Sequence, residues 1–188
     1  LVLVLPWYAI LRRKERADAA TAGPVHDPRN LWVSEDRFTQ NQLTHVVDIK
    51  PGWFRLATLW IVLTVVDVLA RFWYVHGDLG GIQTIHFARW VILLDERHEP
   101  AVRRHRLIFF SNYDGSWENY LGEFIDRAAG ALTAVWSNTQ GFPAARALRK
   151  EGARDEEGFK RWTREHQMPT QVWWTGISGS TVQNVRDD

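Results

Sequence analysis

The fold is decided by Ile82-Gln-Thr-Ile-His-Phe-Ala-Arg-Trp-Val-Ile-Leu-Leu94 and, about a dozen residues later, by Arg106-Leu-Ile-Phe-Phe-Ser-Asn-Tyr-Asp-Gly-Ser-Trp117. Both runs are rich in β-branched and aromatic residues, which favour strands, and a highly charged loop lies between them. The second run leads into a segment whose apolar residues recur at helical spacing. We therefore predict an antiparallel pair of strands at the centre of an α+β domain.

Both faces of the first central strand are largely apolar. Regular alternation along 84–94 places Ile85, Phe87 and Arg89 on one face and His86 on the other. Apolar residues on both faces indicate that both faces are covered. We therefore expect helices on one side of the sheet and a dimer partner, a tandem domain or missing sequence on the other.

The remaining elements complete a familiar order. The sequence predicts strands at 43–49, 84–94, 106–113 and 171–177, a helix at 54–74, and a helix that begins after an N-cap at Ser116. Residues 144–165 are charged and are expected to form a surface helix. The order is that of a ferredoxin-like βαββαβ fold, in which two helices lie on one face of an antiparallel sheet.

Length and composition limit the class of protein. The chain has 188 residues, enough for one domain with a real core, and its net charge of +1 argues against a dedicated nucleic-acid binder. No cysteine is present, which excludes disulfides, thiolate catalysis and cysteine-bound metals. The 11 tryptophans indicate an interface, a ligand cavity or a membrane boundary, although an ordinary aromatic core would also use them.

The first residues are typical of a membrane anchor. An apolar run at 1–11, with Trp7 and Tyr8, is followed by the basic cluster at 12–16. Because the run is too short to cross about 30 Å of hydrocarbon, we expect residues 1–16 to be the end of a transmembrane helix in a longer chain. The basic cluster then marks the cytoplasmic side. The alternative is a buried or interfacial segment of a soluble protein.

The expected organisation has three parts. Residues 1–16 are the end of the anchor, 17–35 have the small-residue and Pro/Gly composition of a linker, and 36–188 form the folded domain. The apolar segment at 54–74 carries Arg55, Asp67 and Arg71. These charges favour a helix packed on the sheet over a second spanning helix, with a second membrane contact as the alternative.

The sequence contains no zinc signature, Walker loop, nucleophile elbow or dinucleotide fingerprint, and we predict no metal site. His86 is the best candidate for a ligand or acid/base group, and Asp114 lies at a strand end near a helix N-terminus. Arg89 is suited to pair with an anionic ligand or with a carboxylate such as Asp114. Each of these residues also has a structural interpretation. His86 could be a hydrogen-bonded histidine, Asp114 a turn residue, and Arg89 one member of a structural ion pair. His45 is a further neighbour to consider.

Three segments carry a family resemblance: Thr84-Ile-His-Phe-Ala-Arg-Trp90, Phe110-Ser-Asn-Tyr-Asp-Gly-Ser-Trp117 and Thr181-Val-Gln-Asn184. They resemble a poorly characterised group of bacterial ferredoxin-like, dimeric α+β barrel proteins, over roughly residues 36 to 188. That group is distantly similar to the dye-decolourising peroxidases, in which a distal Asp of a Gly-x-x-Asp-Gly motif and a distal Arg act on haem-bound peroxide, and a His ligates the iron.

For this chain, the resemblance implies haem, with Asp114 as the acid/base residue, Arg89 as a charge stabiliser and His86 as a ligand. Asp114-Gly115 matches the motif, whereas Ser111 stands where the leading glycine belongs.

Two functions follow from these observations. The first is a membrane-tethered, non-catalytic accessory or docking domain of a membrane protein complex or homo-oligomer, on the cytoplasmic side of the membrane. The second is a haem-dependent, peroxidase-like oxidoreductase that acts on a small or lipid-derived substrate. The incomplete peroxidase motif favours the first.

Overall fold

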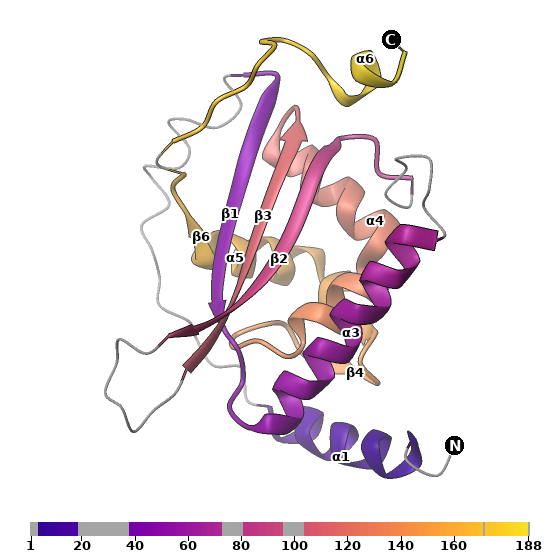
Figure 1. Ribbon diagram of the computed structural model, residues 1–188. Helices are drawn as coiled ribbons and strands as arrows, with labels where there is room; N and C mark the ends of the chain where they lie inside the picture. The colour runs from indigo at the N-terminus through magenta and orange to yellow at the C-terminus, as the bar shows by residue number, and fades with distance from the viewer. Residues whose placement is uncertain (1–3, 19–37, 73–80, 96–103, 171, 188) are drawn as a thin grey trace.

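The computed structural model describes residues 4–18, 38–72, 81–95, 104–170 and 172–187 (Figure 1). The predicted linker lies outside the described residues from residue 19 onward, as does most of the charged loop between the two central strands.

The sheet has four antiparallel strands in the order β2-β3-β1-β6. They are β1 (Gln40–Asp48), β2 (Ile85–Asp95), β3 (Arg104–Asp114) and the short β6 (Gln167–Met168). The two central runs of the sequence pair with each other from Asp95 opposite Arg104 back to Ile85 opposite Tyr113. The predicted antiparallel pair and the α+β class are therefore confirmed, and β1 lies on the other side of β3.

A β-bulge at His86 changes the faces of β2. The register shifts between Ile85 and Phe87, so His86 is the extra residue. Ile85 is buried in the core, and beyond the bulge Ala88 and Trp90 take over the core side. The prediction that Ile85 shares a face with Phe87 is wrong, because one inserted residue reverses the alternation on which it depended.

Helices cover the core face of the sheet. They are α3 (Trp53–Phe72), α4 (Trp117–Trp136) and α5 (Glu156–His166), and the two predicted helices correspond to α3 and α4. In Figure 1, α4 and α5 lie behind the strands, and α3 packs against α4. The side chain of Ser116 accepts the N–H of Asn119 at 3.2 Å, which confirms the predicted N-cap of α4.

The predicted surface helix at 144–165 is only partly correct. The segment contains a small hairpin of β4 (Ala145–Arg146) and β5 (Lys150–Glu151), then a 3₁₀ turn, η1 (Gly152–Arg154), before α5 begins. The carboxylate of Asp155 caps α5 by accepting the N–H of Gly158 at 3.1 Å. This N-cap fixes where the helix begins and separates it from the preceding hairpin.

The predicted strand at 171–177 is not the fourth strand of the sheet. That position is taken by β6, which follows α5 directly and pairs Met168 with Thr44. Pro169 then ends the ladder because it has no N–H to donate. Residues 172–177 carry no strand, and the apolar run Val172-Trp173-Trp174 that suggested one is exposed at its first and last residues.

The tryptophans divide between two environments. Trp117, Trp136 and Trp162 are buried, and Trp136 packs against the rings of Phe109 and Phe124 among others. Four further tryptophans, Trp53, Trp60, Trp173 and Trp174, are exposed. Part of the aromatic content therefore builds an ordinary core, and part of it remains on the surface.

A helix at the N-terminus, α1 (Val4–Ala17), is attached to the domain at both of its ends. Near its start, the ring of Trp7 lies 4.4 Å from that of Phe54 in α3. Near its end, the carboxylate of Glu15 accepts the backbone N–H groups of Ala147 and Leu148 at 3.0 and 2.7 Å. The segment predicted to be the end of an anchor is thus fixed against the folded domain.

Candidate functional site

Two of the three predicted site residues lie together at one end of the sheet. The bulge in β2 turns His86 toward the last residue of β3, and the imidazole Nε2–H donates to Oδ1 of Asp114 at 2.6 Å. Both side chains are partly exposed, at 19% for His86 and 12% for Asp114. A carboxylate that orients an imidazole within reach of solvent is an arrangement used for proton transfer.

The same carboxylate holds the C-terminal segment. Oδ2 of Asp114 accepts the backbone N–H of Val182 at 2.7 Å, at the start of the short helix α6 (Val182–Asp187). The side chain of Gln40 donates to the carbonyl of Ser180 at 2.5 Å. Each carboxylate oxygen of Asp114 therefore has a hydrogen-bond partner. This supports a role in holding the fold together as well as a role in proton transfer.

Arg89 does not join this pair. It lies opposite Phe110, four residues from Asp114 along β3, and its guanidinium carbon is 5.4 Å from the centroid of the Phe87 ring. The predicted pairing of Arg89 with Asp114 is therefore absent from the structure, because the strand register holds the two residues apart along the sheet, and His86 is the residue that contacts the carboxylate. The side chain of Arg89 is exposed on the sheet face that the helices leave open.

The arrangement around His86 also bears on the haem implied by the resemblance. The Nε2 atom that points toward Asp114 is engaged in its hydrogen bond and is not free to ligate iron at the same time. Two hollows in the described part of the chain are lined by residues of α1 and by residues near Pro51 and Trp53. Neither hollow is lined by His86, Arg89 or Asp114.

His45 is not a neighbour of Asp114, because it lies on the buried face of β1. Its ring centroid is 4.6 Å from that of Trp162 and 5.7 Å from that of His166. Burial lowers the pKa of His45 well below its usual value, and the nearby His166 lowers it further. The cavity that His45 lines with Trp162 has a volume of about 10 Å³, which limits it to a single water molecule.

Another feature of the fold is an apolar surface on α3. It consists of exposed side chains on the outer side and in the second half of the helix: Trp60, Ile61, Val65, Val68, Leu69 and Phe72. We call these six residues the α3 apolar surface. The two charges near it, Asp67 and Arg71, pair with each other at 2.9 Å. In the part of the chain that the structure describes, α3 alone is long and apolar enough to cross a membrane, a test that the core helix of a soluble protein also passes.

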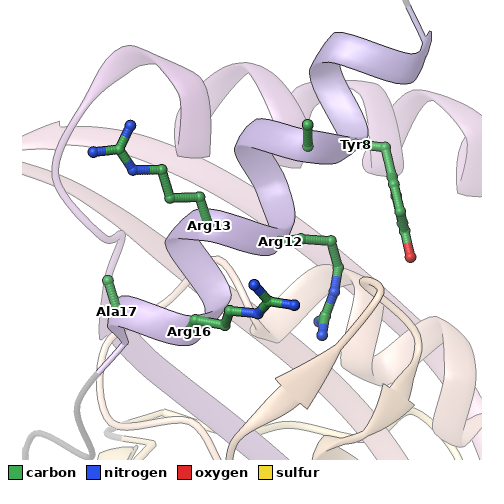
Figure 2. Close-up of a pocket in the computed structure, with 6 residues that line it drawn as sticks. Tyr8, Arg12, Arg13, Arg16 and Ala17 are labelled. Carbon is green, nitrogen blue, oxygen red and sulfur yellow. The ribbon is translucent and has the colours of Figure 1, made fainter.

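A basic hollow lies on α1, next to the start of α3. Tyr8, Ala9 and Ala17 line it together with three arginines, Arg12, Arg13 and Arg16. Figure 2 shows Arg12 and Arg16 extending to the same side of the helix, with Tyr8 one turn before them. We call the three arginines the α1 basic face.

A partly buried ionic cluster joins the end of α1 to the domain. The carboxylate of Asp18 accepts from Lys50 at 2.9 Å and from Arg55 at 2.5 Å. Arg55 is buried, and burial lowers the pKa of Lys50, an effect that the pairing with Asp18 opposes. One carboxylate thus serves two buried or half-buried cations, and it fixes the position of the α1 basic face relative to α3.

Comparison with protein-family models, with curated proteins and with solved structures found no match to this chain. The resemblance to the ferredoxin-like bacterial group therefore stays a prediction.

Proposed function

We propose that this chain is a membrane-associated docking domain, a non-catalytic accessory part of a membrane protein complex. One observation carries the proposal: the α3 apolar surface, which the fold leaves uncovered among the described residues. Monomeric soluble proteins rarely expose a contiguous apolar patch of this kind unless a partner or a membrane covers it.

The size of the surface is sufficient for binding to a bilayer. Full burial of a Val, Leu, Ile or Phe side chain contributes about 2 kcal/mol, and these side chains are on average about half exposed. Six of them supply roughly 6 kcal/mol of gross free energy on transfer out of water. That range suits reversible association of a domain that is already tethered or already has a protein partner.

The helix is proposed to lie on the bilayer surface and not to cross it. Its first half belongs to the core, where Leu59 is fully buried and Arg55 is paired with Asp18. A spanning orientation would expose the core of the domain and place Arg55 in hydrocarbon, which costs several kcal/mol. The second half can enter the interface while the fold stays intact.

The finer parts of the proposal each have their own basis. A ferredoxin-like arrangement is supported by the strand order β2-β3-β1-β6 and by antiparallel pairing throughout. The cytoplasmic side is supported by the α1 basic face, since cationic residues favour that side. A protein partner or second copy on the open sheet face is supported by the exposed Phe87 and Leu93.

Vesicle co-sedimentation tests the proposal. The full chain should bind phosphatidylcholine vesicles, and the triple variant Ile61→Ser, Val65→Ser, Val68→Ser should bind about 100-fold more weakly, because three half-exposed side chains lose their transfer free energy. The matched control is Val172→Ser, Ile177→Ser, Val185→Ser, which removes three exposed apolar side chains elsewhere. Equal binding by the two triple variants, or no binding by the natural chain, would contradict the proposal.

A second function, a haem-dependent peroxidase-like oxidoreductase, is favoured by the His86–Asp114 pair. An absorbance spectrum after incubation with haem separates the two functions. The docking proposal predicts no stable Soret band. A band that survives gel filtration and disappears in His86→Ala, but persists in the control His105→Ala, would establish the second function instead.

A further inference from the structure

We propose that the α1 basic face binds the anionic phospholipid headgroups of the bilayer on which α3 lies. This inference rests on the proposed membrane association and names the lipid class that the surface selects. The argument depends on where the charges and the apolar side chains of α1 are placed.

Apolar and basic residues occupy different halves of α1. The first half exposes Val4, Leu5, Tyr8 and Ile10, and the second half carries the α1 basic face. At 1.5 Å per residue, Arg12 lies about 10 Å from Leu5 along the helix axis. The headgroup region on each side of the hydrocarbon is about 5 to 7 Å thick, so with Leu5 at the hydrocarbon edge the long arginine side chains can reach back to the phosphates.

The outward face of α1 carries no acidic residue in its basic half. The one carboxylate of the helix, Glu15, is turned toward the domain, where its side chain is 2% exposed and binds Arg12 and two backbone N–H groups. Arg13 and Arg16 are both exposed, on different sides of the helix in Figure 2, and no acidic side chain of the described residues pairs with them. The helix macrodipole accounts for a basic residue in the last turn, but it does not require an exposed cationic face.

The apolar surroundings favour a lipid over a soluble anion. Trp7 of α1 packs against Trp53 of α3, with ring centroids 6.1 Å apart, so the α1 basic face and the α3 apolar surface are parts of two connected helices. Free phosphate would use the arginines alone and would leave Leu5 and Tyr8 in water. A bilayer that contains anionic lipid satisfies both kinds of side chain at once.

The test compares the full chain on phosphatidylcholine vesicles with and without phosphatidylserine. Each arginine near an anionic surface strengthens binding about fivefold at moderate salt. The natural chain should therefore bind the anionic vesicles more tightly, and Arg13→Gln, Arg16→Gln should reduce that binding roughly 25-fold. The same variant should bind neutral vesicles as the natural chain does. The matched control, Arg154→Gln, Arg161→Gln, removes two exposed arginines near and on α5 and should keep the anionic preference.

The outcomes separate this inference from the proposed function. If the natural chain binds neutral and anionic vesicles equally, the lipid assignment fails while membrane association stands. If it binds neither, both fail. The assignment also fails if the control loses as much affinity as the α1 variant, or if inorganic phosphate or a short RNA displaces the chain from the vesicles. Raising the salt from about 0.1 M to about 1 M should abolish the preference, because screening shortens the reach of the charges from about 10 to about 3 Å.

Thermal melting shows whether the arginine substitutions change lipid binding alone or also the stability of the fold. Arg13 and Arg16 are exposed and do not contribute to the contacts that attach α1 to the domain. Their substitution should leave the melting temperature unchanged. A variant that melts as the natural chain does, and yet keeps full affinity for the anionic vesicles, overturns the assignment.

Discussion

The two halves of α3 have similar apolar compositions and opposite environments. In the first half Leu59 is 0% exposed and packs in the core, whereas in the second half Phe72 is 75% exposed. The core covers most of the first half, although Trp60 and Ile61 are exposed there, and in the second half Leu63 and Val66 still pack against the core. The core therefore does not account for the six exposed side chains of the α3 apolar surface, and the membrane proposal gives them a separate function.

The largest expected effect is on the buried half. Leu59→Ala should lower the free energy of unfolding by about 3 kcal/mol, because it removes buried methyl groups and leaves a cavity. Urea denaturation without vesicles measures the change. A loss below about 1 kcal/mol would contradict the difference in packing between the two halves, since it would mean that Leu59 is not part of a close-packed core.

The next largest effect is on the pH dependence of stability, through the buried His45. The pKa of His45 is lowered in the folded state. As the pH falls below about 6.5, His45 therefore takes up a proton in the unfolded chain but not in the native chain. Stability is therefore complete above that pH. It declines at lower pH by up to about 1.4 kcal/mol per unit, until the native group also titrates. Denaturation between pH 7 and 5 should show this slope, and His45→Gln should remove its share of it.

A substitution at the other end of the sheet serves as a control for the membrane surface. Asp114 ends β3 at the opposite end of the sheet from α1 (Figure 1). Asp114→Ala removes its bonds to His86 and Val182 and should cost about 1 to 2 kcal/mol, with faster amide exchange at Val182. Vesicle binding should not change. A parallel loss of binding would show that the C-terminal segment contributes to the membrane surface.

The smallest effect on stability is expected in the exposed half. Leu69→Ala is the matched partner of Leu59→Ala, with the same chemical change in the same helix. In the folded chain about half of the Leu69 side chain is exposed to water. The substitution should therefore lower the free energy of unfolding by less than about 1 kcal/mol, and it should weaken vesicle binding roughly threefold because the exposed part is lost from the membrane contact. If the two leucine variants are equally destabilised, the division of α3 into a core half and a surface half is wrong.

The sequence predicts the long elements because their patterns are repeated many times. Alternation over 84–94 and helical spacing from Trp117 onward are each supported by many residues, and the structure confirms both elements. Short features leave no such pattern. The two residues of β6 are too few to show alternation, and Val172-Trp173-Trp174 imitates a strand by composition alone.

The candidate site was only partly predictable for a related reason. His86 and Asp114 were each identified, but their pairing depends on the bulge at His86, which changes register without a change in composition. Arg89 is predicted to pair with Asp114 on charge alone, whereas the strand register places it opposite Phe110. The exposure of the α3 apolar surface was also hidden, since a buried and an exposed apolar half of one helix have the same sequence signature.

The most direct test uses the absence of cysteine, which allows a single spin label at a chosen position. A nitroxide on Val68→Cys, in the α3 apolar surface, is compared with one on Arg154→Cys, in η1. On addition of vesicles, the label at position 68 should collide more with dissolved oxygen and less with a water-soluble nickel complex, while the label at position 154 should not change. If the chain binds the vesicles and the label at position 68 stays as accessible to nickel as before, the proposal that this chain docks through α3 is contradicted.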